Sequence, residues 1–167
     1  NNSELPLSEH HFAIYRWRKH GIKPDEALVA VASEPGVEDQ LLKVLQSAIE
    51  ISHTKVPNAV ECDALDIRHH SKWTEARANH IAENRQLVEH RSQSLTVSHR
   101  ARCKIIDDQI ARATDDKIRL MKESELTRAN ADFNRRMEEI QKAANSADIL
   151  AAPVVFGTIV VKREEAI

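Results

Sequence analysis

Glycine and proline are absent from the 95 residues between Pro57 and Pro153, and the whole chain of 167 residues holds only three glycines and five prolines. Average usage would place about a dozen of these two residues in a stretch of that length. Because glycine and proline end helices, a polar stretch without them is typical of one or two very long helices. Such helices leave little room for the loops that usually build active sites.

Aromatic residues are also scarce, at 4% of the chain against 30% charged residues. A compact globular domain of this length normally buries more Phe, Tyr and Trp, whereas long helices packed along seams of small and aliphatic residues need few. The start of the chain, at Asn1, carries no initiator Met. Together with the lack of a catalytic core, this indicates a piece of a longer protein.

Cysteine is limited to Cys62 and Cys103, which form no CxxC arrangement. The sequence therefore predicts neither a zinc knuckle nor a disulfide framework, and it favours a reducing, cytoplasmic location. The longest apolar run, Val154 to Val161, is far shorter than a membrane span, and the first residues lack a signal-peptide layout. We therefore expect no membrane contact.

The first third of the chain is predicted to form three short helices. Ser8 is a candidate N-cap for the first helix, and Gly21 is expected to end that helix in a left-handed conformation. Pro35-Gly36 is expected to form the turn between the second and third helices. The third helix shows Leu41 and Leu45 within an apolar stripe at spacings of three and four. The helices are predicted over residues 9–20, 24–33 and 37–52, followed by a linker over 53–63.

From about Ala64 to Ala144, weakly apolar residues recur at alternating spacings of three and four, which is typical of a coiled-coil-like seam. A lone seam must be buried, so we expect the helix to fold back on itself. Thr114-Asp115-Asp116 is the favoured break, with Thr114 as cap, because it divides the stretch into arms of more similar length. Ser92 to Ser98, rich in weak helix formers, is the competing break.

After Asn145 the pattern changes, and the β-branched run from Pro153 to Val161 predicts one strand. Its partner is expected at Val56 to Cys62, or else in sequence outside this chain or in another subunit. The fold class is therefore predicted as all-α: a three-helix subdomain, a long helical hairpin and one short terminal strand. The corresponding domain limits are 1–63, 64–148 and 149–167.

Motifs for chemistry are missing. The chain has no GxxxxGK[ST] phosphate loop and no GxSxG nucleophile elbow. Neighbouring acids such as Asp107-Asp108 point to different faces of a helix, so a solvated surface explains them better than acid–base catalysis. Beyond the single pair His80 and Glu83, none of the nine histidines is predicted to lie three or four positions from another His, Cys or carboxylate in a multi-ligand cluster. We predict no metal, no cofactor and no catalytic residue.

Charge is unevenly distributed along the chain. Residues 66 to 104 hold eight basic against four acidic side chains, although the whole chain has a net charge of −2. A basic block of this kind is a candidate for binding a phosphate backbone, with a solvated helix face as the alternative. The candidate nucleic-acid-binding residues are Arg68, Lys72, Arg77, Arg85, Arg91, Arg100, Arg102 and Lys104.

A family resemblance covers about 70 residues, from Gln93 to Val161. The residues that carry it are Ser94-Leu95, Ser98 to Arg102, Asp108 to Ile110, Ala113 to Lys122, Ala131 to Arg136, Ala147 to Ile149, and Pro153 to Gly157. None of them is catalytic. In these residues the stretch resembles the C-terminal tail of a group of bacterial Swi/Snf-related, helicase-like ATPases of superfamily two.

The resemblance implies two upstream RecA-like lobes that bind ATP and magnesium in the parent protein, none of whose motifs are present here. The expected function is a non-catalytic C-terminal accessory module of a helicase-like, DNA-dependent ATPase. It would contribute contact with a DNA or RNA backbone, docking of a protein partner, or regulation of the motor. The alternative is a coiled-coil oligomerisation or scaffold module, for which the partner is a second copy.

Overall fold

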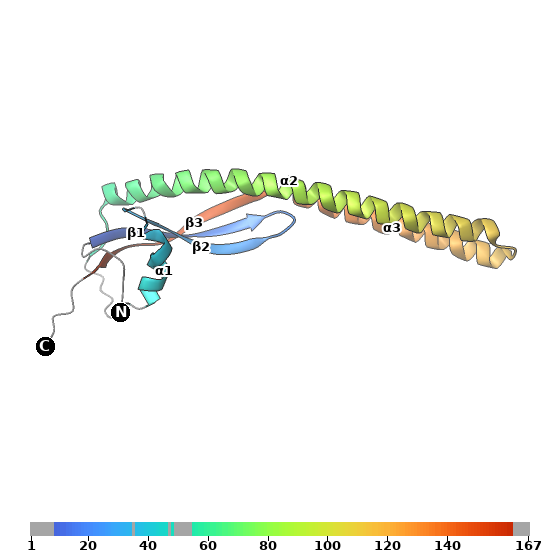
Figure 1. Ribbon diagram of the computed structural model, residues 1–167, viewed down its shortest axis with the longest axis horizontal. Helices are drawn as coiled ribbons and strands as arrows, with labels where there is room; N and C mark the ends of the chain where they lie inside the picture. Colours follow the sequence, from blue (N-terminus) through green and yellow to red (C-terminus); the bar gives the residue numbers. More distant parts are fainter. Residues whose placement is uncertain (1–8, 35, 47, 49–54, 162–167) are drawn as a thin grey trace. The chain divides into compact units, whose positions relative to one another are not determined.

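The computed structural model describes residues 9–34, 36–46, 48 and 55–161 (Figure 1). The elements follow the order β1, β2, α1, α2, α3, β3. The chain divides into two compact units. Unit 1 comprises residues 1–19, 25–78 and 149–167, and unit 2 comprises 20–24 and 79–148. The long helix α2 contributes to both.

Unit 1 is built on an antiparallel sheet of three strands in the order β2-β1-β3. The strands are β1 (Glu9–His20), β2 (Asp25–Ala32) and β3 (Asp148–Val160). In the β1–β2 hairpin, Phe12 lies opposite Ala32 and Lys19 lies opposite Asp25. The all-α prediction is therefore wrong, because the helices expected over 9–20 and 24–33 are both strands.

The reason for this error is that β1 is covered on both faces. Alternate residues of a strand point to opposite faces, and here Phe12 and Ile14 belong to one buried cluster while Ala13 and Tyr15 belong to the other. The sequence of a strand buried on both faces reads as a continuous apolar run, which periodicity alone cannot distinguish from a buried helix. The first cluster is completed by Leu41 of α1, the second by residues of α2.

Helix α1 (Glu38–Gln46) corresponds to the third predicted helix, which was expected over 37–52. Leu41 is fully buried against the sheet, as its place in the apolar stripe predicts, and Leu45 packs against the same cluster. The expected cap Ser8, the turn residue Pro35, and residues 49–52 lie outside the described residues. Gly36 has a φ of 88°, a left-handed conformation that favours glycine.

Helix α2 (Ala59–Arg112) begins within the segment expected to be a linker. Its start is fixed by a reciprocal capping box. The backbone N–H of Glu61 donates to Asn58 Oδ1 at 3.0 Å, and the backbone N–H of Asn58 donates to Glu61 Oε2 at 2.7 Å. The competing break at Ser92 to Ser98 is helical throughout, so the helix continues across its weak helix formers.

Helix α3 (Asp116–Asn145) returns antiparallel to α2 in unit 2, as Figure 1 shows. The favoured break is confirmed, since only residues 113–115 separate the two helices. The cap is Asp115 rather than the expected Thr114: Asp115 is extended, and its carboxylate accepts a hydrogen bond of 2.7 Å from the Lys117 backbone N–H. An ionised carboxylate there also suits the positive end of the helix.

The predicted terminal strand is present, but it begins at Asp148 rather than Pro153 and pairs with β1. The expected partner, Val56 to Cys62, is wrong, because four of its seven residues lie in α2. Gly157 makes the close packing of β3 possible, since a Cβ there would lie 2.6 Å from Cζ of the buried Phe12 ring. Pro153 is tolerated because β3 is an edge strand.

The seam of the hairpin in unit 2 is only partly apolar. Ile106 and Ala129 are buried in it, and Asn84 is buried at its base. The Asn84 side chain accepts a hydrogen bond of 2.7 Å from the backbone N–H of Ile22, in the turn between β1 and β2. At Gly21, with φ of 141°, an added Cβ would lie 2.4 Å from Asn84 Oδ1, so both backbone and space require glycine.

Candidate nucleic-acid interface

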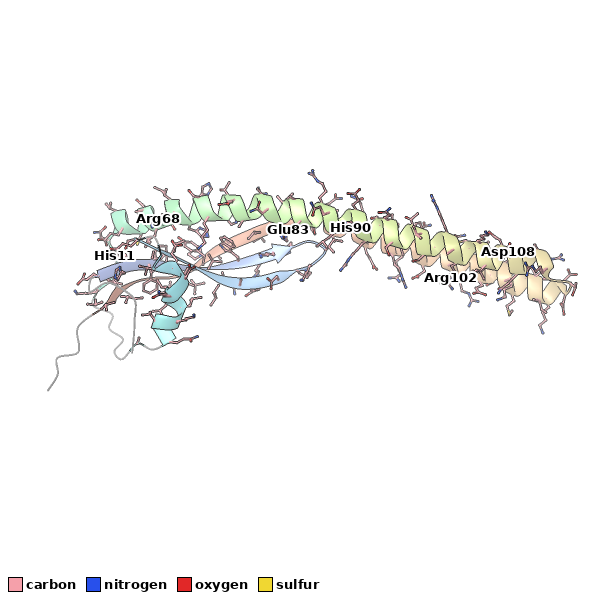
Figure 2. All side chains as sticks on the ribbon, in the orientation of Figure 1. His11, Arg68, Glu83, His90, Arg102 and Asp108 are labelled. Carbon is pink, nitrogen blue, oxygen red and sulfur yellow. The ribbon has the colours of Figure 1, made fainter. Side chains whose placement is uncertain are left out.

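Two of the eight predicted basic residues are used inside unit 1. Arg68, labelled in Figure 2, donates from Nη1 to the carbonyl of Ala32 at 2.7 Å. Lys72 donates from Nζ to the carbonyl of Ala30 at 3.4 Å and lies 3.2 Å from the Glu38 carboxylate. Both carbonyls belong to the edge strand β2, whose unpaired groups would otherwise be open to other chains. These cations therefore join α2 to the sheet.

Arg77 is also engaged within unit 1. Its guanidinium carbon lies 5.5 Å from the ring centroid of Trp73, a cation–π arrangement. The Trp73 indole in turn donates to the carbonyl of Ile149 at 2.9 Å, which fixes the start of β3 against α2. Trp73 is the one Phe, Tyr or Trp between residues 66 and 104, so it is the side chain of the basic block that could stack on bases. Its hydrogen bond to β3 gives it a structural role.

The other five basic residues lie on the unit 2 part of α2. Arg102, labelled in Figure 2, lies 4.0 Å from the Glu125 carboxylate of α3. The remaining four have exposed side chains, and among the described residues they form no ion pair within 4 Å and no hydrogen bond. They are Arg85, Arg91, Arg100 and Lys104.

These four cations do not form one uniform face. At about 100° per residue, Arg85, Arg100 and Lys104 lie within roughly 100° of one another, spread over about 29 Å of helix. Glu89 falls within the same arc, so the surface alternates in sign. Arg91 points to another side of the helix, where it lines a groove.

That groove lies between α2 and α3 and has a volume of about 550 Å³. Ile22, Leu95, Ile140 and Ala143 supply its apolar lining, and Arg91, Arg136, Glu139 and two serines supply polar groups. Two of these charges are already paired. The Arg136 Nε lies 2.9 Å from Asp132, and Glu139 accepts a hydrogen bond of 2.7 Å from Arg135. Arg91 is therefore the charge in the groove with the greatest capacity for an anionic ligand.

A second cluster, missed by sequence reasoning, lies on the α2 side of the sheet in unit 1. The Tyr15 hydroxyl donates to Asp66, and its ring stacks on that of His69 with centroids 3.5 Å apart. The Trp17 indole donates to His69 Nε2 at 2.8 Å. Burial and the bond to Asp66 raise the pKa of Tyr15 far above its usual range, while burial lowers the pKa of His69.

Unit 1 is expected to lose stability as the pH falls below about 6.5, the pKa of a histidine in the unfolded chain. The folded pKa of His69 is lowered by burial, which outweighs the opposing charge of Asp66, and nearby His70 and Lys72 lower it further. The unfolded state therefore takes up the proton first. The stability that neutral His69 contributes is complete above this pH and is lost as the pH falls towards the folded pKa.

The matched variant for this prediction is His69→Gln, which retains an acceptor for Trp17 without titrating. Urea unfolding followed by tryptophan fluorescence, at about pH 7.5 and about pH 5.5, should show a smaller pH dependence in the variant. The same pH dependence in both proteins would contradict a role for His69.

One arrangement in unit 1 resembles a catalytic triad. His11 Nε2 lies 3.1 Å from Glu61 Oε1, and His11 Nδ1 lies 3.0 Å from Thr158 Oγ1. These residues line neither the groove between α2 and α3 nor a second, smaller cavity beside Asp66 and His69. Glu61 also caps α2 through its other oxygen. The three side chains therefore have a structural role: their contacts link β1, β3 and the start of α2.

Across the part of the chain that the structure describes, no three His, Cys, Asp or Glu side chains gather in a way that could hold a metal ion. The same residues contain no helix that is long and apolar enough to cross a bilayer. His99 and Cys103, which lie four residues apart on α2, have side chains in contact, and the i, i+4 spacing in the sequence is the signal for this pair.

Comparisons with protein-family models, curated proteins and solved structures found no match to this chain.

Proposed function

We propose that this chain is a non-catalytic accessory module of a helicase-like, DNA-dependent ATPase, and that its helical hairpin holds a nucleic-acid backbone. The observation that carries the proposal is the set of four exposed cations on α2 in unit 2, Arg85, Arg91, Arg100 and Lys104, which lack protein partners among the described residues. The resemblance to the tails of Swi/Snf-related ATPases supports the same reading. In this proposal ATP and magnesium bind upstream lobes of the parent protein.

The charge pattern indicates the kind of contact to expect. Residues 79–112 of α2 carry six basic and four acidic side chains, so attraction to phosphate is modest and depends on salt. Side chains that reach phosphates position a duplex without reading its sequence. With α2 and α3 packed side by side, the hairpin offers about 45 Å of rigid surface. The hairpin would hold the nucleic-acid backbone in position for the motor.

The test is a binding titration of a fluorescent DNA duplex at increasing salt. With three phosphate contacts, from Arg85, Arg100 and Lys104 on one side of α2, the association constant should fall about 40-fold between about 50 and 200 mM salt. Replacing all four residues, Arg85, Arg91, Arg100 and Lys104, by glutamine should flatten this dependence. Glutamine is nearly as good a helix former as arginine, so the helix should persist.

The matched control removes the same net charge from α3, by replacing Lys117, Arg119, Arg128 and Lys142 with glutamine. It should bind the duplex with nearly wild-type salt dependence. Absence of binding at the lowest salt, or equal losses in the two quadruple variants, would refute the proposed interface. If the activity of the parent ATPase nevertheless required the hairpin, protein docking or regulation of the motor would be the better explanation.

A second candidate is an oligomerisation module, favoured by large apolar side chains exposed on the hairpin. Val97, Ile105, Leu120 and Met121 are between 58% and 66% exposed. Exposed apolar residues of this size on a helix pair are a potential interface with a second copy. Light scattering separates the candidates: a mass that rises with protein concentration favours oligomerisation, and a constant monomer mass favours the self-folded hairpin.

The proposal also places the chain in the cytoplasm. Both cysteines are free thiols, which suits a reducing compartment. The partners would be the upstream lobes of the same polypeptide and a nucleic-acid backbone.

A further inference from the structure

Cys103 and His99 form a thiol–imidazole pair on the α2 side of the hairpin seam. The Cys103 sulfur lies 3.4 Å from His99 Nε2 and 3.7 Å from His99 Nδ1. At nearly equal distances from both nitrogens, the sulfur lies against the imidazole ring and not along the lone pair of either nitrogen. His99 therefore acts on the thiol through its charge, because an imidazolium in contact with the sulfur favours the thiolate. Residues at i and i+4 share one face of a helix, so the backbone itself keeps the pair together.

Helix α3 holds this pair from the other side. The ring of Phe133 stacks on His99, with centroids 4.2 Å apart and planes inclined by 11°. The side-chain amide of Asn130 lies 3.8 Å from the Cys103 sulfur. Either end of an amide can face the sulfur, so Asn130 can accept from the thiol or donate to the thiolate. A nucleophilic thiol, an imidazole in contact with it and the Phe133 ring that orients this imidazole are thus assembled from two helices.

We propose that Cys103 is a thiol modification site, activated by His99, that reacts with hydrogen peroxide and with small electrophiles. The thiolate is the reactive form of cysteine, and transfer of the S–H proton to imidazole produces a thiolate beside an imidazolium. Both side chains are only partly buried, so a small reagent can reach the sulfur. This inference is independent of nucleic-acid binding.

The reaction with peroxide balances without any further reagent. The Cys103 thiolate attacks one peroxide oxygen, an S–O bond forms, and the O–O bond breaks. The departing hydroxide takes the proton from the His99 imidazolium and leaves as water. Sulfur is oxidised by two electrons and peroxide is reduced, which gives a sulfenic acid and neutral imidazole.

Cys62 provides an internal comparison because no imidazole among the described residues contacts its thiol. Its thiol donates to the carbonyl oxygen of Pro57 at 3.7 Å. A backbone carbonyl can accept that hydrogen bond but cannot take the proton, so it does not generate a thiolate. The two cysteines of one chain can therefore be measured in the same tube.

The experiment measures alkylation of native protein by iodoacetamide, and oxidation by hydrogen peroxide with a 1,3-diketone trap for sulfenic acid. Mass spectrometry quantifies the Cys62 and Cys103 peptides. We expect Cys103 to react about 10-fold faster than Cys62 near neutral pH, and the two to react alike in concentrated urea. Equal rates in the native protein would overturn the proposal.

Two variants test the role of His99. His99→Phe retains the stacking on Phe133 and removes both ring nitrogens, and His99→Gln keeps the polarity without a base. Each should lower the Cys103 rate about 10-fold, with the Cys62 rate unchanged. An unchanged Cys103 rate in a folded variant would overturn the assignment of His99. If one variant fails to fold by circular dichroism, the other and the urea comparison still decide the question.

Discussion

Replacing Leu65 by alanine should lower the free energy of unfolding of unit 1 by about 2–5 kcal/mol. The Leu65 side chain is 1% exposed and belongs to the cluster that includes Tyr15, Trp17 and Ile149. These residues come from α2, β1 and β3, so this one side chain joins the helix to the sheet. Truncation removes buried methyl groups and leaves a cavity that the surrounding strands can fill only in part.

Urea unfolding followed by tryptophan fluorescence is the appropriate measurement, since Trp17 and Trp73, the two tryptophans of the chain, both lie in unit 1. The control is Ile67→Ala, two residues further along α2, where the side chain is 69% exposed. That change should alter stability by no more than about 0.5 kcal/mol. Similar losses in the two variants would mean that α2 does not pack on the sheet through Leu65.

Gly157→Val should destabilise unit 1 by about 3 kcal/mol, although valine is the better strand former. Strand propensity favours valine by about 1 kcal/mol at most. Against this, a Cβ at position 157 would lie 2.6 Å and 2.7 Å from two atoms of the Phe12 ring, which is 5% exposed and cannot swing away. Overpacking of a tight core typically costs about 1–3 kcal/mol, and three added carbons place this change at the upper end.

The matched control is Ala152→Val, an exposed position on the same strand, where the change should be neutral or stabilising. A double-mutant cycle with Phe12→Leu gives a further check. The smaller residue makes room for valine, so the double variant should lose less stability than the sum of the two single variants. Strict additivity, or a stabilised Gly157→Val, would show that the ring of Phe12 does not block position 157.

The long helices and their turn were predictable because their determinants are local. Backbone hydrogen bonds in a helix join residues four apart. A long stretch without Gly or Pro is therefore sufficient to indicate a long helix. The acidic pair Asp115-Asp116 marks a helix start in the same way. Sequence reasoning selected the correct break, and it erred by one residue on the cap, because Thr and Asp are both good capping residues.

The strands β1 and β2 could not be recognised in the same way. Phe12 to Tyr15 is apolar at every position because α1 and α2 cover opposite faces of β1, and β2 is rich in alanine, a helix former. The start of α2 lies within the predicted linker, because Pro57 and Asn58 favour a loop in the sequence while Asn58 and Glu61 form a capping box in the structure. Tertiary contacts decided these elements against their local preferences.

The candidate interface contains fewer basic residues than the sequence predicts, for a related reason. A charge count identifies Arg68, Lys72 and Arg77 as basic, but it does not show that β2 carbonyls and the Trp73 ring already bind them. Only the tertiary structure, which places these three side chains opposite the sheet, reveals that they are engaged. The cations of unit 2 therefore remain as the candidate interface. The contact between His99 and Cys103 was readable from spacing alone, but its third partner, Asn130 of α3, was not.

The sequence by itself determined the long helices and the presence of a terminal strand, and it favoured the correct position for the turn, because helix formation and capping depend on neighbours within about four residues. Only the tertiary structure decided that two apolar segments near the start are strands, that β3 pairs with β1, and which basic side chains face solvent. Strand pairing and burial depend on residues far apart in the chain: Phe12 and Gly157 meet across 145 positions of sequence. No local pattern encodes that contact.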